Sequence, residues 1–129
     1  MSLPKILIVD DDESSRQLLS EVLEANGYEV GAVEDGTAAR AELSRDGGYR
    51  IVVADLRMPK ETGLELLRNL RQQNSNYEII LMSSFISSNE REVAQELGAH
   101  ALLEKPFRLT ELLEVVAELA NKKTMSITK

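Results

Sequence analysis

Five short apolar runs recur along the chain, and a segment with helical periodicity follows each of them. The runs consist mainly of Ile, Leu and Val without alternating polar residues, which is typical of strands buried on both faces. Gly31 interrupts the second run and suggests that this strand lies at an edge of the sheet. Strands that alternate with helices predict a parallel, doubly wound α/β sheet with helices on both faces. The runs are residues 6–9, 30–33, 51–54, 79–82 and 101–103.

The helical segments carry local signals at their ends. Asp12 is expected to cap the first helix, which should stop at Asn26 and Gly27. Ser87 and Glu90 have the spacing of a capping box at the start of the fourth helix. The segments with helical periodicity are residues 18–25, 36–46, 64–70, 87–97 and 109–119.

The composition excludes several kinds of function. The chain has 129 residues, the size of one domain, and its formal net charge of −7 leaves no basic surface for nucleic acid. It has no cysteine, so thiolate metal sites are excluded, and its single histidine, His100, is expected to be structural. No apolar run is long enough to span a membrane, and no signal peptide opens the chain. We therefore expect an acidic cytoplasmic domain that binds neither nucleic acid nor a membrane directly.

Polar residues follow four of the predicted strands. Asp10 and Asp11 follow the first strand, Asp55 the third and Ser83 the fourth, and Lys105 comes shortly after the fifth. Ligands of doubly wound sheets bind outside the carboxyl ends of the strands, so we expect these side chains to converge. Taken singly, each could be a helix cap, a turn residue or a surface charge. These separate roles do not explain why three carboxylates, a hydroxyl and an ammonium would all lie at one edge of the sheet.

This combination of groups suits phosphoryl transfer. Close carboxylates repel one another and attract a hard cation, and carboxylates with waters match the octahedral preference of Mg²⁺. A carboxylate that is free to turn toward substrate can act as a nucleophile and form an aspartyl phosphate. The cation, the ammonium and the hydroxyl would neutralise charge on the phosphoryl oxygens. The sequence therefore predicts a phosphoryl-accepting aspartate with Mg²⁺, a lysine and a hydroxyl around it.

Four motifs lie at the ends of the predicted strands. They are Ile6-Leu7-Ile8-Val9-Asp10-Asp11, Asp55-Leu56-Arg57-Met58-Pro59 with Gly63, Leu81-Met82-Ser83, and Lys105-Pro106-Phe107. Together these motifs resemble the receiver domain of two-component response regulators, and the resemblance extends from about Lys5 to Ala120. It implies a flavodoxin-like, five-stranded parallel sheet with strand order 2-1-3-4-5 and five helices.

The resemblance also implies roles for individual residues. Asp55 would receive a phosphoryl group from a histidine kinase or a phosphotransfer protein. Ser83 would supply the hydroxyl and Lys105 the ammonium that bind this group, and the bond between Lys105 and Pro106 would be cis. Phosphorylation would switch the face of the fourth helix and fifth strand for a downstream output domain, an output protein or a second copy of the chain. Mg²⁺ would be held by Asp10 (largely through water), Asp11, Asp55 and the backbone carbonyl of Arg57.

The sequence departs from the family pattern at three positions. Leu102 stands where many receivers carry a Tyr or Phe that moves with the switch hydroxyl. Activation is therefore expected to run through residues 83–86, with Phe85 as the aromatic participant. Ser83 replaces the commoner threonine but keeps the hydroxyl, and Arg108 begins the last helix where a small polar cap is common.

Two other functions are open. Asp10, Asp12 and Ser14 resemble the opening motif of haloacid-dehalogenase-type phosphatases, in which Asp10 would be the nucleophile. Those enzymes need a further acidic motif on a later strand, and only a helix and a tail follow Lys105. A degenerate receiver used as a scaffold would lose the acids or the lysine, which are all present here. We expect a signalling phosphoacceptor that catalyses at most its own phosphorylation and dephosphorylation.

The predicted receiver domain covers residues 1–121. Residues 122–129 are expected to be a fraying polar tail or the start of a linker. Nothing in the sequence resembles a DNA-binding, cyclase or ATPase module, so the output would lie outside this chain.

Overall fold

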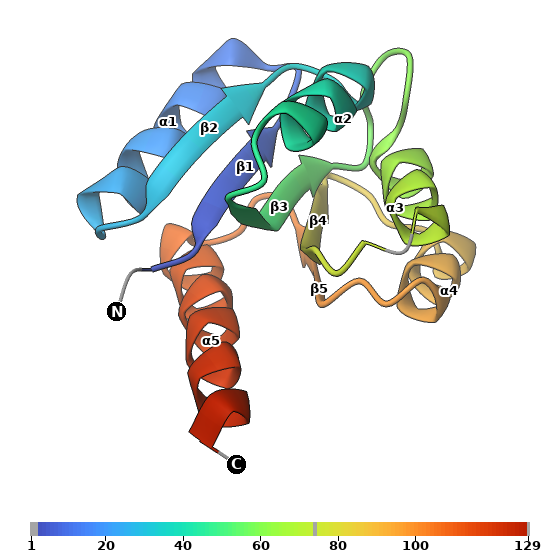
Figure 1. The fold of residues 1–129 in the computed structure, drawn as a ribbon. Coiled ribbons are helices and arrows are strands. Elements are labelled where there is room, and N and C mark those ends of the chain that lie inside the picture. Colours follow the sequence, from blue (N-terminus) through green and yellow to red (C-terminus); the bar gives the residue numbers. More distant parts are fainter. Residues whose placement is uncertain (1–2, 74, 129) are drawn as a thin grey trace.

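The computed structural model describes residues 3–73 and 75–128, with side chains described as far as residue 121. Within these residues one sheet of five strands has the order β2-β1-β3-β4-β5, and every neighbouring pair is parallel (Figure 1). The predicted doubly wound, flavodoxin-like topology is confirmed. The strands are β1 (Lys5–Val9), β2 (Glu29–Val33), β3 (Tyr49–Asp55), β4 (Glu78–Ser83) and β5 (Ala101–Glu104).

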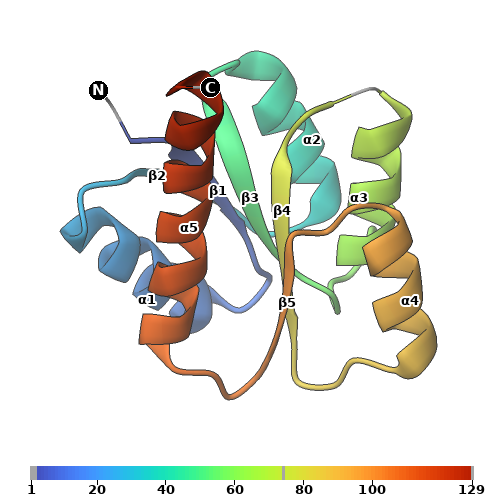
Figure 2. The same ribbon diagram turned by 90° about the horizontal axis from the view of Figure 1, so that it is seen from below.

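Five helices of the described chain form the outer layers. Figure 2 shows α1 and α5 on one side of the sheet, with α2, α3 and α4 on the other. Because the strands are all parallel, the loops that follow them gather at a single edge, where ligands of doubly wound sheets bind. The helices are α1 (Glu13–Ala25), α2 (Gly36–Arg45), α3 (Gly63–Gln72), α4 (Ser88–Glu96) and α5 (Leu109–Thr128).

The central strands are buried on both faces, as their apolar runs predicted. In β1, Ile6 and Ile8 pack into the core beneath α1 and α5, whereas Leu7 and Val9 pack beneath α2 and α3. Burying a side chain of this kind contributes about 1.5–3 kcal/mol. The apolar run ends at Val9, so Asp10 is the first polar side chain at the carboxyl end of β1.

The signals at the helix ends are confirmed. Asp12 caps α1 by accepting a hydrogen bond from a backbone N–H of the first turn at 2.8 Å. Asn26 ends α1, and Gly27 follows with a φ of +94°, a conformation that glycine adopts without strain. Ser87 and Glu90 form the predicted capping box of α4.

The second strand lies at the edge of the sheet, as Gly31 suggested. The glycine is also required for space, because a Cβ at this position would collide with the side chain of Tyr49. The sequence indicated the edge position but gave no sign of this close approach.

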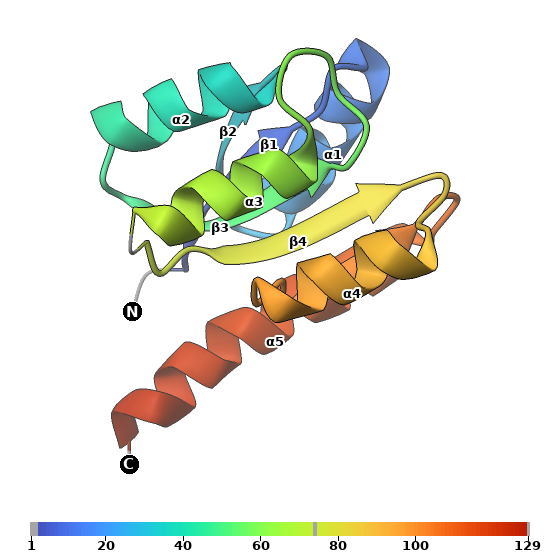
Figure 3. The ribbon, with the colours of Figure 1, turned by 90° about the vertical axis from the view of Figure 1, so that its right-hand side faces the viewer.

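The last helix is longer than predicted. Its bounds include residues 122–128, which were expected to fray as a polar tail, and residue 129 lies outside the described chain. The segment contains neither glycine nor proline, so no residue stops the helix. Figure 3 shows the C-terminal end of α5 projecting past the sheet. Its role as a linker stays a prediction. None of the described helices combines the length and apolar composition of a membrane span.

Candidate phosphoacceptor site

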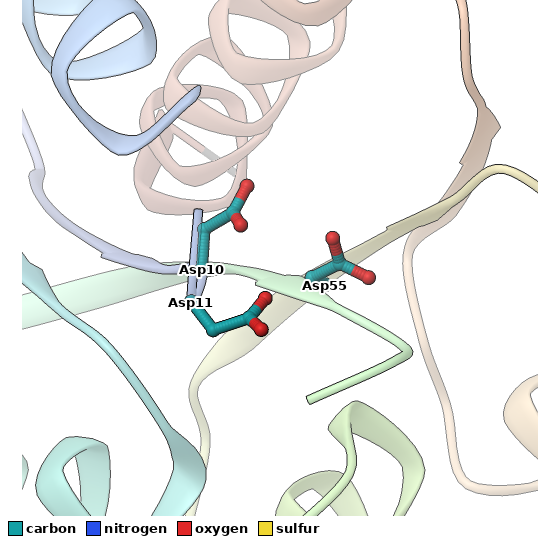
Figure 4. Close-up of side chains that lie close together, drawn as sticks. All are labelled: Asp10, Asp11 and Asp55. Carbon is teal, nitrogen blue, oxygen red and sulfur yellow. The ribbon is translucent and has the colours of Figure 1, made fainter. Parts of the chain in front are cut away.

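Three carboxylates meet at the carboxyl end of the sheet. Asp10 and Asp11 directly follow β1, and Asp55 is the last residue of β3. Each offers an oxygen within 4.8 Å of the others, and Figure 4 shows the side chains gathered at the ends of these two strands. They converge because β1 and β3 are parallel neighbours that end at the same edge. The convergence predicted for these residues is confirmed.

Asp10 is the most deeply enclosed of the three. It is fully buried, and its Oδ1 accepts a hydrogen bond from the Asp12 backbone N–H at 2.9 Å. Its Oδ2 has no hydrogen-bond partner among the described residues. Burial raises the pKa of the Asp10 carboxyl, and the Asp55 and Asp11 charges add to this effect. A buried carboxylate oxygen without a partner, beside two further carboxylates, fits a bound cation.

Lys105 reaches the cluster from the loop after β5. Its Nζ donates to Oδ2 of Asp55 at 2.8 Å and lies 3.7 Å from Oδ2 of Asp10, beyond hydrogen-bond range. Burial alone would lower the pKa of Lys105, but the carboxylates of Asp55 and Asp10 outweigh it, and the pKa is raised. The side chain is therefore a firmly charged ammonium beside Asp55. Its peptide bond to Pro106 is cis, as the resemblance implied.

The chain after Asp55 turns tightly against β3. Oδ1 of Asp55 accepts a hydrogen bond from the Arg57 backbone N–H at 2.9 Å. Gly63 starts α3 against this turn, and its N–H donates to the Leu56 carbonyl at 3.2 Å. A Cβ on Gly63 would lie 2.6 Å from the carbonyl oxygen of Asp55, so no larger residue fits here without a shift. The role of the Arg57 carbonyl as a metal ligand stays a prediction.

The Ser83 hydroxyl is buried at the end of β4, and its hydrogen bonds are with its own loop. Its Oγ donates to the Phe85 carbonyl at 2.9 Å and accepts from the Phe85 N–H at 3.3 Å. The preceding residue, Met82, pairs with Asp55 across the sheet, so Ser83 is nevertheless close to the acceptor. A phosphoryl group on Asp55 would have to compete with Phe85 for this hydroxyl.

The side chain of Arg57 connects two loops of the site, which the sequence did not reveal. Its guanidinium forms a two-pronged ion pair with Glu90, with one N–O distance of 2.8 Å, and donates to the Phe85 carbonyl at 3.1 Å. Glu90 also accepts the Ser87 N–H at 3.0 Å as part of the capping box. Arg57, with help from Ser87, lowers the pKa of the Glu90 carboxyl to about 2. A contact between residues 33 positions apart leaves no local pattern.

A second missed contact anchors the loop after Asp55. Glu61 is almost fully buried and receives two hydrogen bonds from Arg40 of α2, at 2.7 and 3.1 Å. Asn69 of α3 donates to the same carboxylate at 3.2 Å. Lys60, next to Glu61, has a φ of 68°, which is uncommon for a residue with a side chain. These bonds hold the loop against α2 and α3 and so keep Asp55 in place.

Four further residues named in the sequence analysis lie outside the carboxylate cluster. The His100 ring is 3.1 Å from the Glu118 carboxylate. It lies near the amino end of β5, the end opposite to Asp10, Asp11 and Asp55, which agrees with a structural role. Leu102 packs against the core from β5. Phe85 is 62% exposed, so most of its side chain lies in solvent. Arg108 precedes α5, and its N–H is bound by a carboxylate of the first turn.

The sequence matches the family model described as response regulator receiver domain over residues 6–117. It is 36% identical over 108 residues to YkoG of Bacillus subtilis, named an uncharacterized transcriptional regulatory protein, with 84% of this chain and 47% of YkoG covered. It is 37% identical over 115 residues to the response regulator MprA of Mycobacterium leprae, with coverage of 89% and 50%. The chain thus spans about half the length of these curated relatives.

Solved receiver structures are also similar to this chain. The receiver domain of Francisella response regulator 1452 has a TM-score of 0.85 at 32% identity, with 93% of this chain and 98% of that chain covered. A CheY-like receiver from Methanospirillum hungatei has a TM-score of 0.90 at 26% identity, with coverage of 97% and 99%. The chain therefore belongs to the response regulator receiver domain family and to two-component signalling.

Proposed function

We propose that Asp55 is the phosphoacceptor and that it takes a phosphoryl group from a histidine kinase or a phosphotransfer protein. The observation that carries the proposal is the hydrogen bond of 2.8 Å between the Lys105 ammonium and Oδ2 of Asp55. Asp10 is fully enclosed, whereas Asp55 is 7% exposed, and this difference disfavours the phosphatase alternative with Asp10 as nucleophile. Asp11 has no lysine partner among the described contacts.

We propose Mg²⁺ as the cation of this site. Asp11, Asp55 and the backbone carbonyl of Arg57 would bind it directly, and Asp10 largely through water. The fit rests on the unpartnered Oδ2 of Asp10 and on three clustered carboxylates, of which only Asp55 and Asp10 lie near the Lys105 ammonium among the described residues. When bound, the ion would neutralise charge on phosphoryl oxygens.

The transfer follows from the positions of these side chains. A carboxylate oxygen of Asp55 attacks phosphorus, the bond between phosphorus and the donor nitrogen breaks, and the donor histidine leaves. The Lys105 ammonium, already beside Asp55, pairs with a phosphoryl oxygen. The Ser83 hydroxyl leaves the Phe85 carbonyl and donates to another phosphoryl oxygen. Both residues thereby bind the charge that the transfer brings into the site.

The output of the switch is proposed to lie in a partner. Ser83 and Phe85 lead directly into α4, so their movement would change the face formed by α4 and β5. One curated relative of about twice the matched length is named a transcriptional regulatory protein. A downstream output domain, an output protein or a second copy of this chain would read that face. The chain would act as a signalling phosphoacceptor, not as an enzyme with turnover, and would not touch nucleic acid itself.

Intact-protein mass spectrometry after incubation with acetyl phosphate and Mg²⁺ tests the acceptor. Wild-type protein should gain one phosphoryl group, and Asp55→Asn should gain none. Asp46→Asn is the matched control, because it makes the same change at the opposite end of the sheet, and it should be phosphorylated normally. An undiminished adduct on Asp55→Asn would refute the assignment. Continuous phosphate release that depends on Asp10 would favour the phosphatase instead.

A further inference from the structure

Arg57 is placed between the acceptor and the start of α4. Its backbone N–H binds Oδ1 of Asp55, while its guanidinium reaches Glu90 and the Phe85 carbonyl. The side chain of Arg57 is 50% exposed, and that of Glu90 is 19% exposed. Glu90 is the main cause of the raised pKa of Arg57, and the Asp55 carboxylate, which accepts the Arg57 backbone N–H, contributes as well.

We propose that Arg57 is a phosphoryl-binding residue that changes partner during signalling. It pairs with Glu90 in the unphosphorylated protein and with the phosphoryl group on Asp55 after phosphorylation, and this exchange releases the start of α4. The inference rests on the proposed function of Asp55.

The charges favour the exchange. Phosphorylation adds about 1.5 to 2 negative charges at neutral pH to Asp55, whose carboxylate already contacts the Arg57 backbone N–H. The planar fork of an arginine binds phosphate oxygens with the same two-pronged geometry as a carboxylate. Because half of the Arg57 side chain is in solvent, it can turn without disturbing the core.

The contacts of the Phe85 carbonyl show what the exchange would release. This oxygen accepts hydrogen bonds from both Ser83 Oγ and Arg57 in the resting protein. The phosphoryl group withdraws both donors at once, so the Phe85 carbonyl loses its hydrogen bonds to Ser83 and to Arg57 together. Glu90 keeps its bond to the Ser87 N–H, and α4 therefore moves as an intact helix. This route needs no aromatic side chain at Leu102.

The alternative is that Arg57 stays paired with Glu90 and only restrains the loop. Mutations distinguish the two arrangements by whether they weaken or strengthen binding of a phosphoryl mimic. If Arg57 exchanged partners, removing its charge would weaken binding of a phosphoryl mimic, whereas removing the charge of Glu90 would free Arg57 and strengthen it. If Arg57 only restrained the loop, both changes would act in the same direction. Glutamine at position 90 still completes a capping box, so Glu90→Gln leaves the start of α4 intact.

The test measures the affinity for beryllium fluoride at saturating Mg²⁺ by calorimetry. Arg57→Gln should weaken binding, and Glu90→Gln should strengthen it, each by about two- to fivefold, the range that a half-exposed ion pair supports. Arg57→Lys keeps the charge without the fork and should recover part of the loss. Arg91→Gln is the matched control, since Arg91 also pairs from α4 with a carboxylate, Glu104 at 3.3 Å, and it should bind like wild type.

A second measurement on the wild-type protein avoids dependence on variants. The side-chain Nε–H signal of Arg57 in NMR spectra should shift when beryllium fluoride is added. An unmoved signal, wild-type affinity in Arg57→Gln, or changes of the same sign in Arg57→Gln and Glu90→Gln would each overturn the inference. Failure of the wild-type protein to bind beryllium fluoride at all would instead refute the proposed role of Asp55.

Discussion

Charged side chains lie at both ends of the sheet, but they are paired differently. At the amino end, the acidic side chains form ion pairs with basic ones. There, the Lys5 ammonium binds the carboxylate of Asp46 and lies 3.6 Å from that of Glu29. Arg50 pairs with Glu78 across the starts of β3 and β4 at 3.4 Å. Each of these carboxylates is paired with a lysine or an arginine, so their charges are neutralised within the protein.

Tyr49, also at the amino end, likewise finds its partners within the protein. Its hydroxyl donates to Glu42 at 2.8 Å, and the Lys5 ammonium lies 4.5 Å from the centre of its ring. Burial, followed by the Glu42 carboxylate, raises the pKa of Tyr49 to about 12, so the phenol stays neutral at physiological pH. These groups stabilise the fold by satisfying one another.

The carboxyl end lacks this balance. The Lys105 ammonium pairs with Asp55 and lies 3.7 Å from Asp10, Asp11 has no ion-pair partner among the described residues, and a buried oxygen of Asp10 has no hydrogen-bond partner there. Uncompensated charge in a buried site is costly for folding and is characteristic of groups that bind something. The contrast between the ends therefore identifies the carboxyl end as the functional one.

The largest expected effect that tests this contrast is stabilisation by Mg²⁺. At a free concentration of about 100 times the dissociation constant, binding adds about 2.7 kcal/mol to the free energy of unfolding. Thermal unfolding should therefore shift upward by several degrees. Asp11→Asn should lose most of the shift, whereas Asp46→Asn at the amino end should keep it. Equal shifts in these two variants would remove the distinction between the ends.

A somewhat smaller effect is expected from adding one methyl group at each end. Gly63→Ala should lower the free energy of unfolding by about 2 kcal/mol, because its Cβ would meet the carbonyl oxygen of Asp55 at 2.6 Å. Gly47→Ala, in the loop before β3, meets nothing within 4 Å and should change stability by less than about 0.5 kcal/mol. Urea denaturation measures both. A tolerated Gly63→Ala would show that the turn after Asp55 can relax.

The smallest expected effect is a change in the free energy of unfolding that has opposite signs at the two ends. In EDTA at neutral pH, Asp10→Asn should raise the free energy of unfolding by about 1 kcal/mol, because it removes a buried, poorly compensated charge. Asp46→Asn should lower it, because Lys5 and then the Gly48 N–H hold the pKa of Asp46 below its ordinary value. That stabilisation is present above the ordinary pKa of Asp46 and is lost as the pH falls below it. Changes of the same sign in the two variants, measured by urea denaturation, would contradict the comparison.

The sequence by itself determined the strands, their parallel arrangement and the edge at which the polar residues meet. Burial on both faces leaves continuous apolar runs such as residues 51–54, and the residue after each run must emerge at the carboxyl edge. Asp10 and Asp55 were identified for this reason, and Lys105 was identified two positions beyond the fifth run. The capping of α1 and α4 was equally predictable, because a cap acts over three residues of sequence.

Only the tertiary structure decided how these groups are paired. Arg57 reaches Glu90 and Arg40 reaches Glu61 across 33 and 21 positions, and such contacts depend on which loops the fold brings together. The turn of the Ser83 hydroxyl toward its own loop likewise reflects a choice among nearby acceptors. Periodicity records which face of an element is buried, whereas charged side chains at loop ends have several possible partners. Their pairing is settled only when distance, burial and competing charges act together.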